Sequence, residues 1–134
     1  MFSAPLEASA DTYLRLADPY DPVAPLADRA RAYLETNCAH CHMPGGTALG
    51  GLDLRYVTSI EAMQACGVAP SEGDLGMAGA LVIDAGHPER SVLSLRMHSL
   101  AEGDRMPPLA TSVVDTVGVQ VIDAWITSMT GCGG

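Results

Sequence analysis

Aromatic side chains are scarce in this sequence: its 134 residues include one Trp, one Phe and four Tyr. Hydrophobic residues nevertheless make up 48% of the chain, which is enough to form one core in a domain of this size. Either Leu, Val and Ala fill that core alone, or a large, flat, apolar group from outside the chain shares it with them. Composition leaves both interpretations open.

Basic residues and long apolar runs are also few. Seven Lys and Arg stand against 16 Asp and Glu, for a formal net charge of −9, and this sign argues against a protein that binds nucleic acid through its phosphates. No apolar run approaches the roughly 20 residues of a membrane span. The segment from Met1 to Glu7 has neither the basic nor the apolar region of a signal peptide.

Prolines gather near the start of the chain, among them Pro22 and Pro25. Closely spaced prolines break regular structure, so we predict an irregular arm over residues 1–27, with one short helical turn near 12–16. A single domain is predicted over 28–134. The arm either packs on this domain or links it to a preceding one.

Four segments of the domain have sequence patterns typical of helices. The last shows apolar residues at intervals of three or four, and Ser112 and Asp115 have the spacing of a capping box at its start. We predict an all-α domain with helices at 26–38, 59–66, 88–99 and 112–129, and a short extended run at 81–83. The loops between them are long for a small domain, which is reasonable if they wrap around a bound group.

The motif Cys38-Ala39-His40-Cys41-His42 carries the clearest chemical signal in the chain. A C-x-x-C-H sequence is typical of covalent haem attachment. Two thiols about one helical turn apart bond to the haem vinyl groups, and the histidine that follows becomes an axial ligand of the iron. We therefore predict one covalent haem c, attached to Cys38 and Cys41 and ligated by His42.

Chance aside, two other interpretations of the motif compete with haem attachment. A structural zinc site needs four ligands in two pairs, and the sequence has no second C-x-x-C or H-x-x-x-H motif. The motif also resembles the active site of periplasmic thiol oxidases of the thioredoxin fold. That fold requires a β-strand before the motif and a sheet beneath it, whereas the sequence predicts a helix before Cys38.

The stretch 30–132 resembles a bacterial monohaem cytochrome c domain. The similarity lies in the helix before the motif, the Pro-Gly-Gly turn at 44–46, the Met-Pro-Pro segment at 106–108 and a C-terminal helix with Trp125. The chain is also similar to the C-terminal cytochrome-like part of larger secreted bacterial proteins, which have no firmly assigned activity. The resemblance implies a cytochrome c-like fold, with several helices and long loops wrapped around one haem.

Met106 is the predicted sixth ligand of the haem iron, because Met–His ligation suits electron transfer. It lies in a loop far enough from His42 to cross the haem, and two prolines that follow it stiffen that loop. The resemblance to cytochromes c points to the same methionine. The alternatives are another loop methionine and three histidines: Met77, His40, His87 and His98.

Cys66 and Cys132 remain after haem attachment takes two of the four cysteines. Haem attachment implies an exported protein, and disulfides persist in oxidising compartments, so we predict a Cys66–Cys132 disulfide. The alternative is two free buried thiols. Because arginine suits carboxylates, Arg55 is the first candidate to pair with a haem propionate. The other candidate arginines are Arg90, Arg96 and Arg105.

These features together predict an electron carrier without enzymatic activity, or the electron-transfer domain of a larger redox enzyme. We expect a periplasmic or otherwise exported location, in which case the sequence is a mature form or part of a longer chain. The acidic surface would be steered toward a basic patch on a redox partner or a fused catalytic domain. The alternatives are a haem enzyme or gas sensor with a labile sixth ligand, and a thiol–disulfide oxidoreductase.

Overall fold

The regular elements of this domain are all helical. The computed structural model describes residues 8–13 and 15–133. In chain order its elements are η1 (Ala10–Thr12), α1 (Leu26–Asn37), η2 (Pro88–Arg90), α2 (Val92–His98) and α3 (Thr116–Ser128), where η marks a 3-10 helix. Over the described ranges there is no continuous β-strand, so the domain is all-α, as predicted. Within the same ranges, no helix is both long and apolar enough to cross a membrane.

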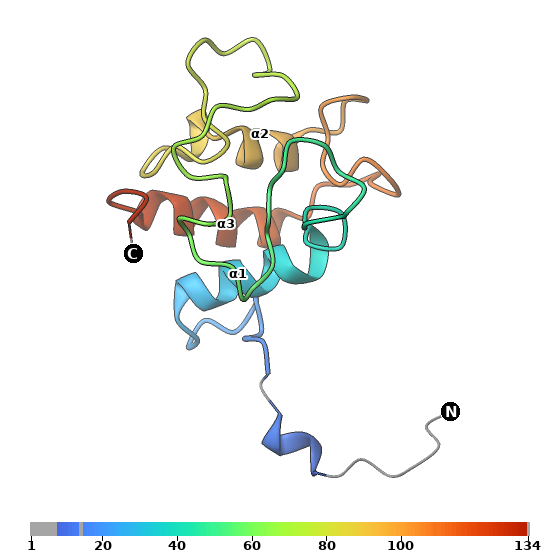
Figure 1. Cartoon of the computed structure of the whole chain (residues 1–134), viewed down its shortest axis with the longest axis vertical. Helices are drawn as coiled ribbons and strands as arrows, with labels where there is room; N and C mark the ends of the chain where they lie inside the picture. The colour runs from blue at the N-terminus through green and yellow to red at the C-terminus, as the bar shows by residue number, and fades with distance from the viewer. Residues whose placement is uncertain (1–7, 14, 134) are drawn as a thin grey trace.

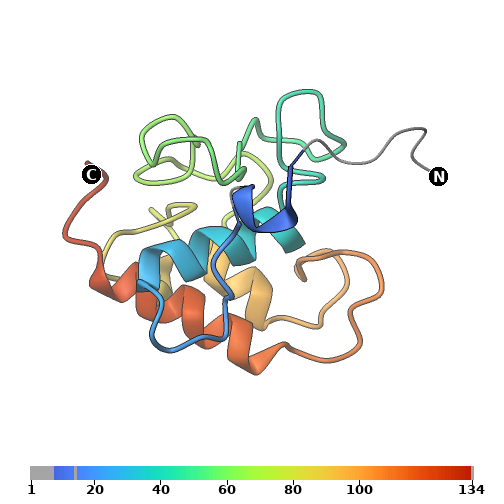
Figure 2. The ribbon, with the colours of Figure 1, turned by 90° about the horizontal axis from the view of Figure 1, so that it is seen from below.

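The helices α1 and α3 form the framework of the domain. Figure 1 shows α3 between α1 and α2, and Figure 2 shows α1 and α3 side by side. They are in close contact where Gly118 of α3 meets Tyr33 of α1: a Cβ atom on Gly118 would lie 2.2 Å from the Tyr33 ring. Only glycine allows this approach, because any larger residue would displace the buried ring.

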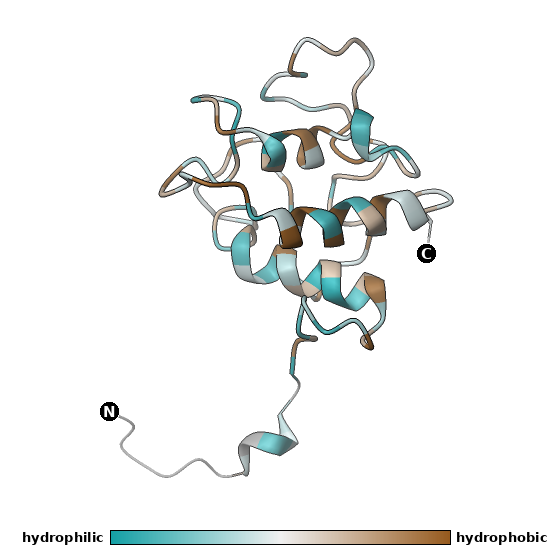
Figure 3. Cartoon of the chain, turned by 180° about the vertical axis from the view of Figure 1, so that it is seen from behind, coloured by the Kyte–Doolittle hydropathy of each residue, from teal (hydrophilic) through white to brown (hydrophobic). Residues whose placement is uncertain are grey.

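The apolar core lies along this framework. Leu34 of α1, Ile122 and Ile126 of α3, and Met63 from a connecting loop are completely buried, and Trp125 is nearly so. Figure 3 shows more hydrophobic colour along α3 than along α1, whose outer side is mainly hydrophilic. This difference follows from the position of α3 between two other helices.

Three of the four predicted helices differ from the structure. The predicted helix at 59–66 is wrong: the chain forms only turns there and then pairs with an extended segment. Gly67 N–H donates to the carbonyl of Ile83 (3.0 Å), and Ile83 N–H donates to the carbonyl of Ala65 (3.0 Å). Hydrogen bonds between distant segments therefore replace those of a helix.

The predicted helix at 88–99 is broken at Ser91 into η2 and α2. Ser91 has extended backbone, with φ −90° and ψ 114°, and it forms an isolated bridge with Leu81. Its hydroxyl donates to the carbonyl of His87 (2.9 Å) and accepts from the N–H of Asp84 (2.9 Å). A buried serine that satisfies nearby backbone groups in this way competes with helix formation.

The last helix, α3, begins at Thr116, whereas the predicted helix begins at Ser112. Asp115, not Ser112, is the N-cap of α3, and its Oδ1 accepts from the N–H of Gly118 at 2.9 Å. The residues from 112 to 115 belong instead to the loop before α3.

The later part of the predicted arm contacts the domain, because Arg29 Nε donates to the carbonyl of Pro19 at 2.9 Å. Of the predicted turn near 12–16, η1 covers only Thr12, and residue 14 lies outside the described residues.

Cys66 and Cys132 form a disulfide in the structure, as predicted. The bond joins the loop after the 59–64 turns to the segment that follows α3. The sulfur of Cys132 also lies 3.3 Å from the position of a Cβ on Gly67. The segment that follows α3 is thus fixed to the middle of the domain.

Loss of the disulfide is expected to lower the free energy of unfolding by about 4 kcal/mol, because closing a loop with a sequence separation of 66 restricts the unfolded chain. Urea unfolding of the double variant Cys66→Ser/Cys132→Ser measures this difference. Alkylation of the denatured protein without reductant, followed by intact mass, tests the bond itself. Alkylation of Cys66 and Cys132 under those conditions would contradict the disulfide.

Candidate cofactor-binding site

A cavity of about 850 Å³ lies between α1, α2 and three of the loops. Apolar side chains dominate its walls, among them Leu52, Leu54, Val92 and Leu93. The volume falls within the range of small-molecule and cofactor sites, which are mostly apolar with a few well-placed polar groups. The position of those polar groups therefore indicates what the cavity holds.

The Cys38–His42 motif forms a further turn at the end of α1. The N–H of Cys41 and the N–H of His42 both donate to the carbonyl of Cys38, at 3.1 and 2.9 Å. This turn brings Cys38, Cys41 and His42 to the wall of the cavity. The three residues predicted from the motif are thus placed together, and α1 fixes their position.

The loop after the motif holds this turn from the other side. Gly46 lies so close to it that a Cβ atom would be 2.1 Å from the Cys41 carbonyl oxygen. The same carbonyl accepts from the N–H of Ala48 (3.2 Å), and Leu54 N–H donates to the carbonyl of His42 (2.9 Å). Each end of the Cys41–His42 pair is therefore tied to the returning chain.

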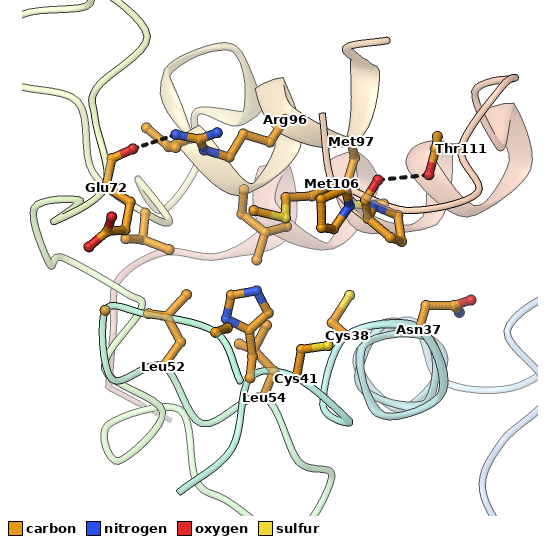
Figure 4. A pocket seen from close by; sticks show the side chains of 18 of the residues that line it. Asn37, Cys38, Cys41, Leu52, Leu54, Glu72, Arg96, Met97, Met106 and Thr111 are labelled. Atoms are coloured by element: carbon orange, nitrogen blue, oxygen red, sulfur yellow. Dashed lines mark hydrogen bonds between the residues drawn. The ribbon is translucent and has the colours of Figure 1, made fainter. Parts of the chain in front are cut away.

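Met106 lines the cavity from the wall opposite the cysteines. Figure 4 shows Cys38 and Cys41 on one side, and Met106 and Met97 on the other. Met106 belongs to the loop between α2 and α3, and its N–H donates to the carbonyl of Arg96 at 3.0 Å. Thr111 Oγ1 donates to the carbonyl of the next residue, Pro107, at 2.7 Å. The methionine loop is thus fastened on both sides of Met106.

The alternative sixth ligands lie in less suitable places. Met77 does not line the cavity. His98 is paired with Asp123 at 2.9 Å and His87 with Glu89 at 3.2 Å, and neither ring lines the cavity. The side chain of His40 does line it, but His40 is an exposed residue between the two cysteines. Met97 was not predicted as a ligand; it lines the cavity and is also buried in the core.

The environment of His42 favours the form of histidine that ligates a metal. Burial lowers the pKa of His42, and the neighbouring His40 lowers it further, so the ring is neutral at pH 7. Its Nδ1 atom is buried without a hydrogen-bond partner in the part of the chain that the structure describes. The described residues therefore leave one polar atom of the ring unsatisfied.

The first cysteine of the motif has the opposite character to a reactive thiol. Burial and the neighbouring Cys41 raise the pKa of Cys38 to about 12. Cys38 is consequently protonated at neutral pH, whereas disulfide exchange requires a thiolate. The residue before it ends a helix, and no sheet lies beneath it in the described ranges.

Arg55 is not at the cavity, in contrast to its predicted role. Its guanidinium binds both carboxylate oxygens of Asp53, with Nε to Oδ1 at 2.8 Å and Nη2 to Oδ2 at 2.7 Å. These hydrogen bonds hold the pKa of Asp53 well below its usual range. The guanidinium that was predicted to pair with a haem propionate therefore already pairs with Asp53, two residues away in the chain. Of the four candidate arginines, only Arg96 lines the cavity.

Asp115 lines the cavity, and this position was not predicted from the sequence. Its Oδ2 accepts from the hydroxyls of Tyr33 (3.0 Å) and Tyr20 (3.2 Å), while Oδ1 caps α3. The hydrogen bond from Gly118 N–H, followed by those from the tyrosines, lowers the pKa of Asp115. One carboxylate thus joins the arm, α1 and α3 beside the cavity. The only sequence signal was its place in a capping box, which pointed to Ser112 as the cap.

Comparison of the chain with protein-family models, with curated proteins and with solved structures found no match. The cavity and the residues on its walls are therefore the basis for the function proposed below. The motif supplies two thiols and an imidazole to the lining of the cavity. The opposite wall supplies methionine sulfur, a soft ligand that suits iron in haem proteins.

The substitution Asp115→Ala is expected to lower the free energy of unfolding by about 1 kcal/mol at pH 7, as the loss of an N-cap usually does. Because the folded-state pKa of Asp115 is lowered, its contribution is present above the ordinary Asp pKa and is lost as the pH falls through the lowered value. The difference from wild type should therefore narrow below about pH 4.

Urea unfolding of Asp115→Ala and wild type at pH 7 and pH 3 measures this effect. Glu102→Ala, which removes an exposed carboxylate elsewhere, serves as the charge-matched control. A stability difference for Asp115→Ala that is the same at both pH values would contradict the role assigned to the carboxylate.

Proposed function

We propose that this chain is an electron-transfer domain with one covalently attached haem c. The observation that carries the proposal is the position of Cys38 and Cys41 on one wall of an apolar cavity of about 850 Å³, with Met106 on the wall opposite. His42, the next residue after Cys41, also lines this cavity. When bound, a haem supplies a single iron centre that exchanges one electron at a time. The cavity size and the donor atoms on its walls fit such a group.

Each of the four residues has a separate role in this proposal. Cys38 and Cys41 would hold the haem through thioether bonds, and their backbone turn fixes the spacing of the two sulfurs. His42 would provide the proximal nitrogen, and its neutral ring is ready to ligate. Met106 would provide the sixth ligand, and Met–His ligation raises the reduction potential.

Met106 fits the role of sixth ligand better than Met97. Met97 belongs to α2 and is only 9% exposed, as part of the hydrophobic core. A methionine in that position is accounted for as a core residue. Met106 comes from a loop, is outside the core cluster and lines the cavity, so its sulfur is free to bind a group inside the cavity.

With both His42 and Met106 as ligands, the iron would have no open site for a substrate or a gas. The proposal is for this reason an electron carrier, and a haem enzyme or gas sensor with a labile sixth ligand is the alternative. A thiol–disulfide oxidoreductase is disfavoured because Cys38 follows a helix and the described residues form no sheet.

The cytochrome c-like fold is part of the same proposal. Its support is the motif after the helix α1, the methionine loop before α3, and the close approach of these two helices at Gly118.

The location and the partner follow from the same proposal. Haem attachment and a Cys66–Cys132 disulfide both suit an exported, oxidising location such as the periplasm. A formal net charge of −9 favours a redox partner protein, or a fused catalytic domain, with a basic docking patch. The chain would then serve as a carrier or as one domain of a larger redox enzyme.

The substitution Met106→Ala tests the sixth ligand in protein that has been loaded with haem. Ferric wild type should show the weak red-end absorbance band typical of methionine sulfur on iron(III), and the ferrous form should not bind carbon monoxide. Met106→Ala should lose the band and bind carbon monoxide, because its sixth position is open. Met77→Ala, which removes a methionine away from the cavity, should behave as wild type.

The same spectra separate the alternatives. Persistence of the band in Met106→Ala, with its loss in Met97→Leu, would assign the sixth ligand to Met97 instead. A high-spin ferric spectrum in wild type would support a haem enzyme or sensor. The complete absence of a haem spectrum, after expression with haem-attachment machinery, would favour the thiol oxidoreductase and contradict the proposal.

A further inference from the structure

Arg96 joins two of the loops that line the cavity. It lies in α2 and lines the cavity wall beside Met106. Its Nη1 donates to the carbonyls of Gly103 and Asp104, both at 3.0 Å. Its Nη2 donates to the carbonyl of Glu72 at 2.7 Å, a bond drawn in Figure 4. One side chain therefore connects α2 to a loop on either side.

The backbone of Arg96 holds the same methionine loop at a second point. The N–H of Met106 donates to the Arg96 carbonyl at 3.0 Å. The segment from Gly103 to Met106 is thus bound to Arg96 at both ends, through side chain and main chain. A methionine side chain is long and flexible, so the position of its sulfur depends on how firmly its backbone is held.

The hydrogen bonds of residue 96 to two loops require the side chain of an arginine. The guanidinium is a planar fork of five donors, and it donates to carbonyls in two directions from one group. A lysine has the same charge, but its single ammonium group cannot span two loops in this way. Charge and geometry can therefore be separated by substitution.

We propose that Arg96 is the positioning residue that keeps Met106 on the haem iron. This inference rests on the function proposed above, and it assigns to Arg96 a role distinct from pairing with a haem propionate. Its carbonyl partners all belong to loop backbone. Loss of the fork would release the Gly103–Asp104 end of this segment and leave only the main-chain hydrogen bond at Met106. The sulfur would then leave the iron more often while the haem stayed attached through Cys38 and Cys41.

The test compares loaded wild type with Arg96→Ala and Arg96→Lys. Imidazole binding to the ferric haem measures how easily the sulfur is displaced. Both variants should bind imidazole about tenfold more tightly than wild type, since a hydrogen bond to a charged donor is worth about that factor. The red-end band of methionine on iron(III) should weaken in both, and the amount of covalent haem per chain should not change.

Arg90→Ala is the matched control, because it removes an arginine that pairs with Asp84 away from the cavity. It should leave imidazole affinity as in wild type. Wild-type imidazole affinity in Arg96→Lys, with a change only in Arg96→Ala, would show that charge matters and would overturn the proposal. Unchanged affinity in both variants would overturn it as well.

Two further outcomes are separated by the same samples. If Arg96→Ala does not fold, as judged by circular dichroism, Arg96→Lys decides alone, together with amide hydrogen exchange at Met106. Faster exchange at Met106 than in wild type supports the role, and unchanged exchange overturns it. A wild type without covalent haem would overturn the proposed function itself, whereas a loaded wild type with unaffected variants overturns only the role of Arg96.

Discussion

The turn from Cys38 to His42 is the constraint on which the rest of the site depends. It brings two sulfurs and one imidazole to the same cavity, and it does so as a turn that directly follows α1. The carbonyl of Cys38 accepts two N–H groups within the motif, and Gly46 allows the returning loop to pass against the Cys41 carbonyl. The direction of α1 therefore determines where the donor atoms lie.

The remaining elements support this turn at a distance. Gly118 brings α3 against Tyr33 of α1, and Asp115 joins α1, α3 and the arm beside the cavity. The opposite wall is assembled from a short helix and two loops joined by Arg96. A haem in the cavity would supply the large, flat, apolar body that a chain with 4% aromatic residues lacks. The long loops then have a surface to pack on.

Much of the framework was predictable because local sequence patterns determine it. The α1 helix, the end of α3 and the Cys38–His42 turn follow from helical periodicity and from one short motif. The Cys66–Cys132 pairing followed from counting the cysteines that remained. These features depend on residues close in sequence, or on chemistry that leaves few choices.

The errors arose where distant segments compete with local preference. The 59–66 segment forms hydrogen bonds with Ile83 in place of a helix, and Ser91 binds neighbouring backbone and so breaks the predicted 88–99 helix. Arg55 was predicted to pair with a haem propionate because arginine suits carboxylates, yet its guanidinium binds the carboxylate of Asp53. Arg96 was one arginine among four, since nothing local shows that α2 would carry it to the cavity between two loops.

The measurement that tests the account most directly is the intact mass of the chain produced together with bacterial haem-attachment machinery. The account predicts one added haem per chain that survives denaturation, in wild type and in the Cys66→Ser/Cys132→Ser variant. The Cys38→Ser/Cys41→Ser variant should carry none. A wild-type chain without added mass, or a haem that stays attached when Cys38 and Cys41 are replaced, would contradict it.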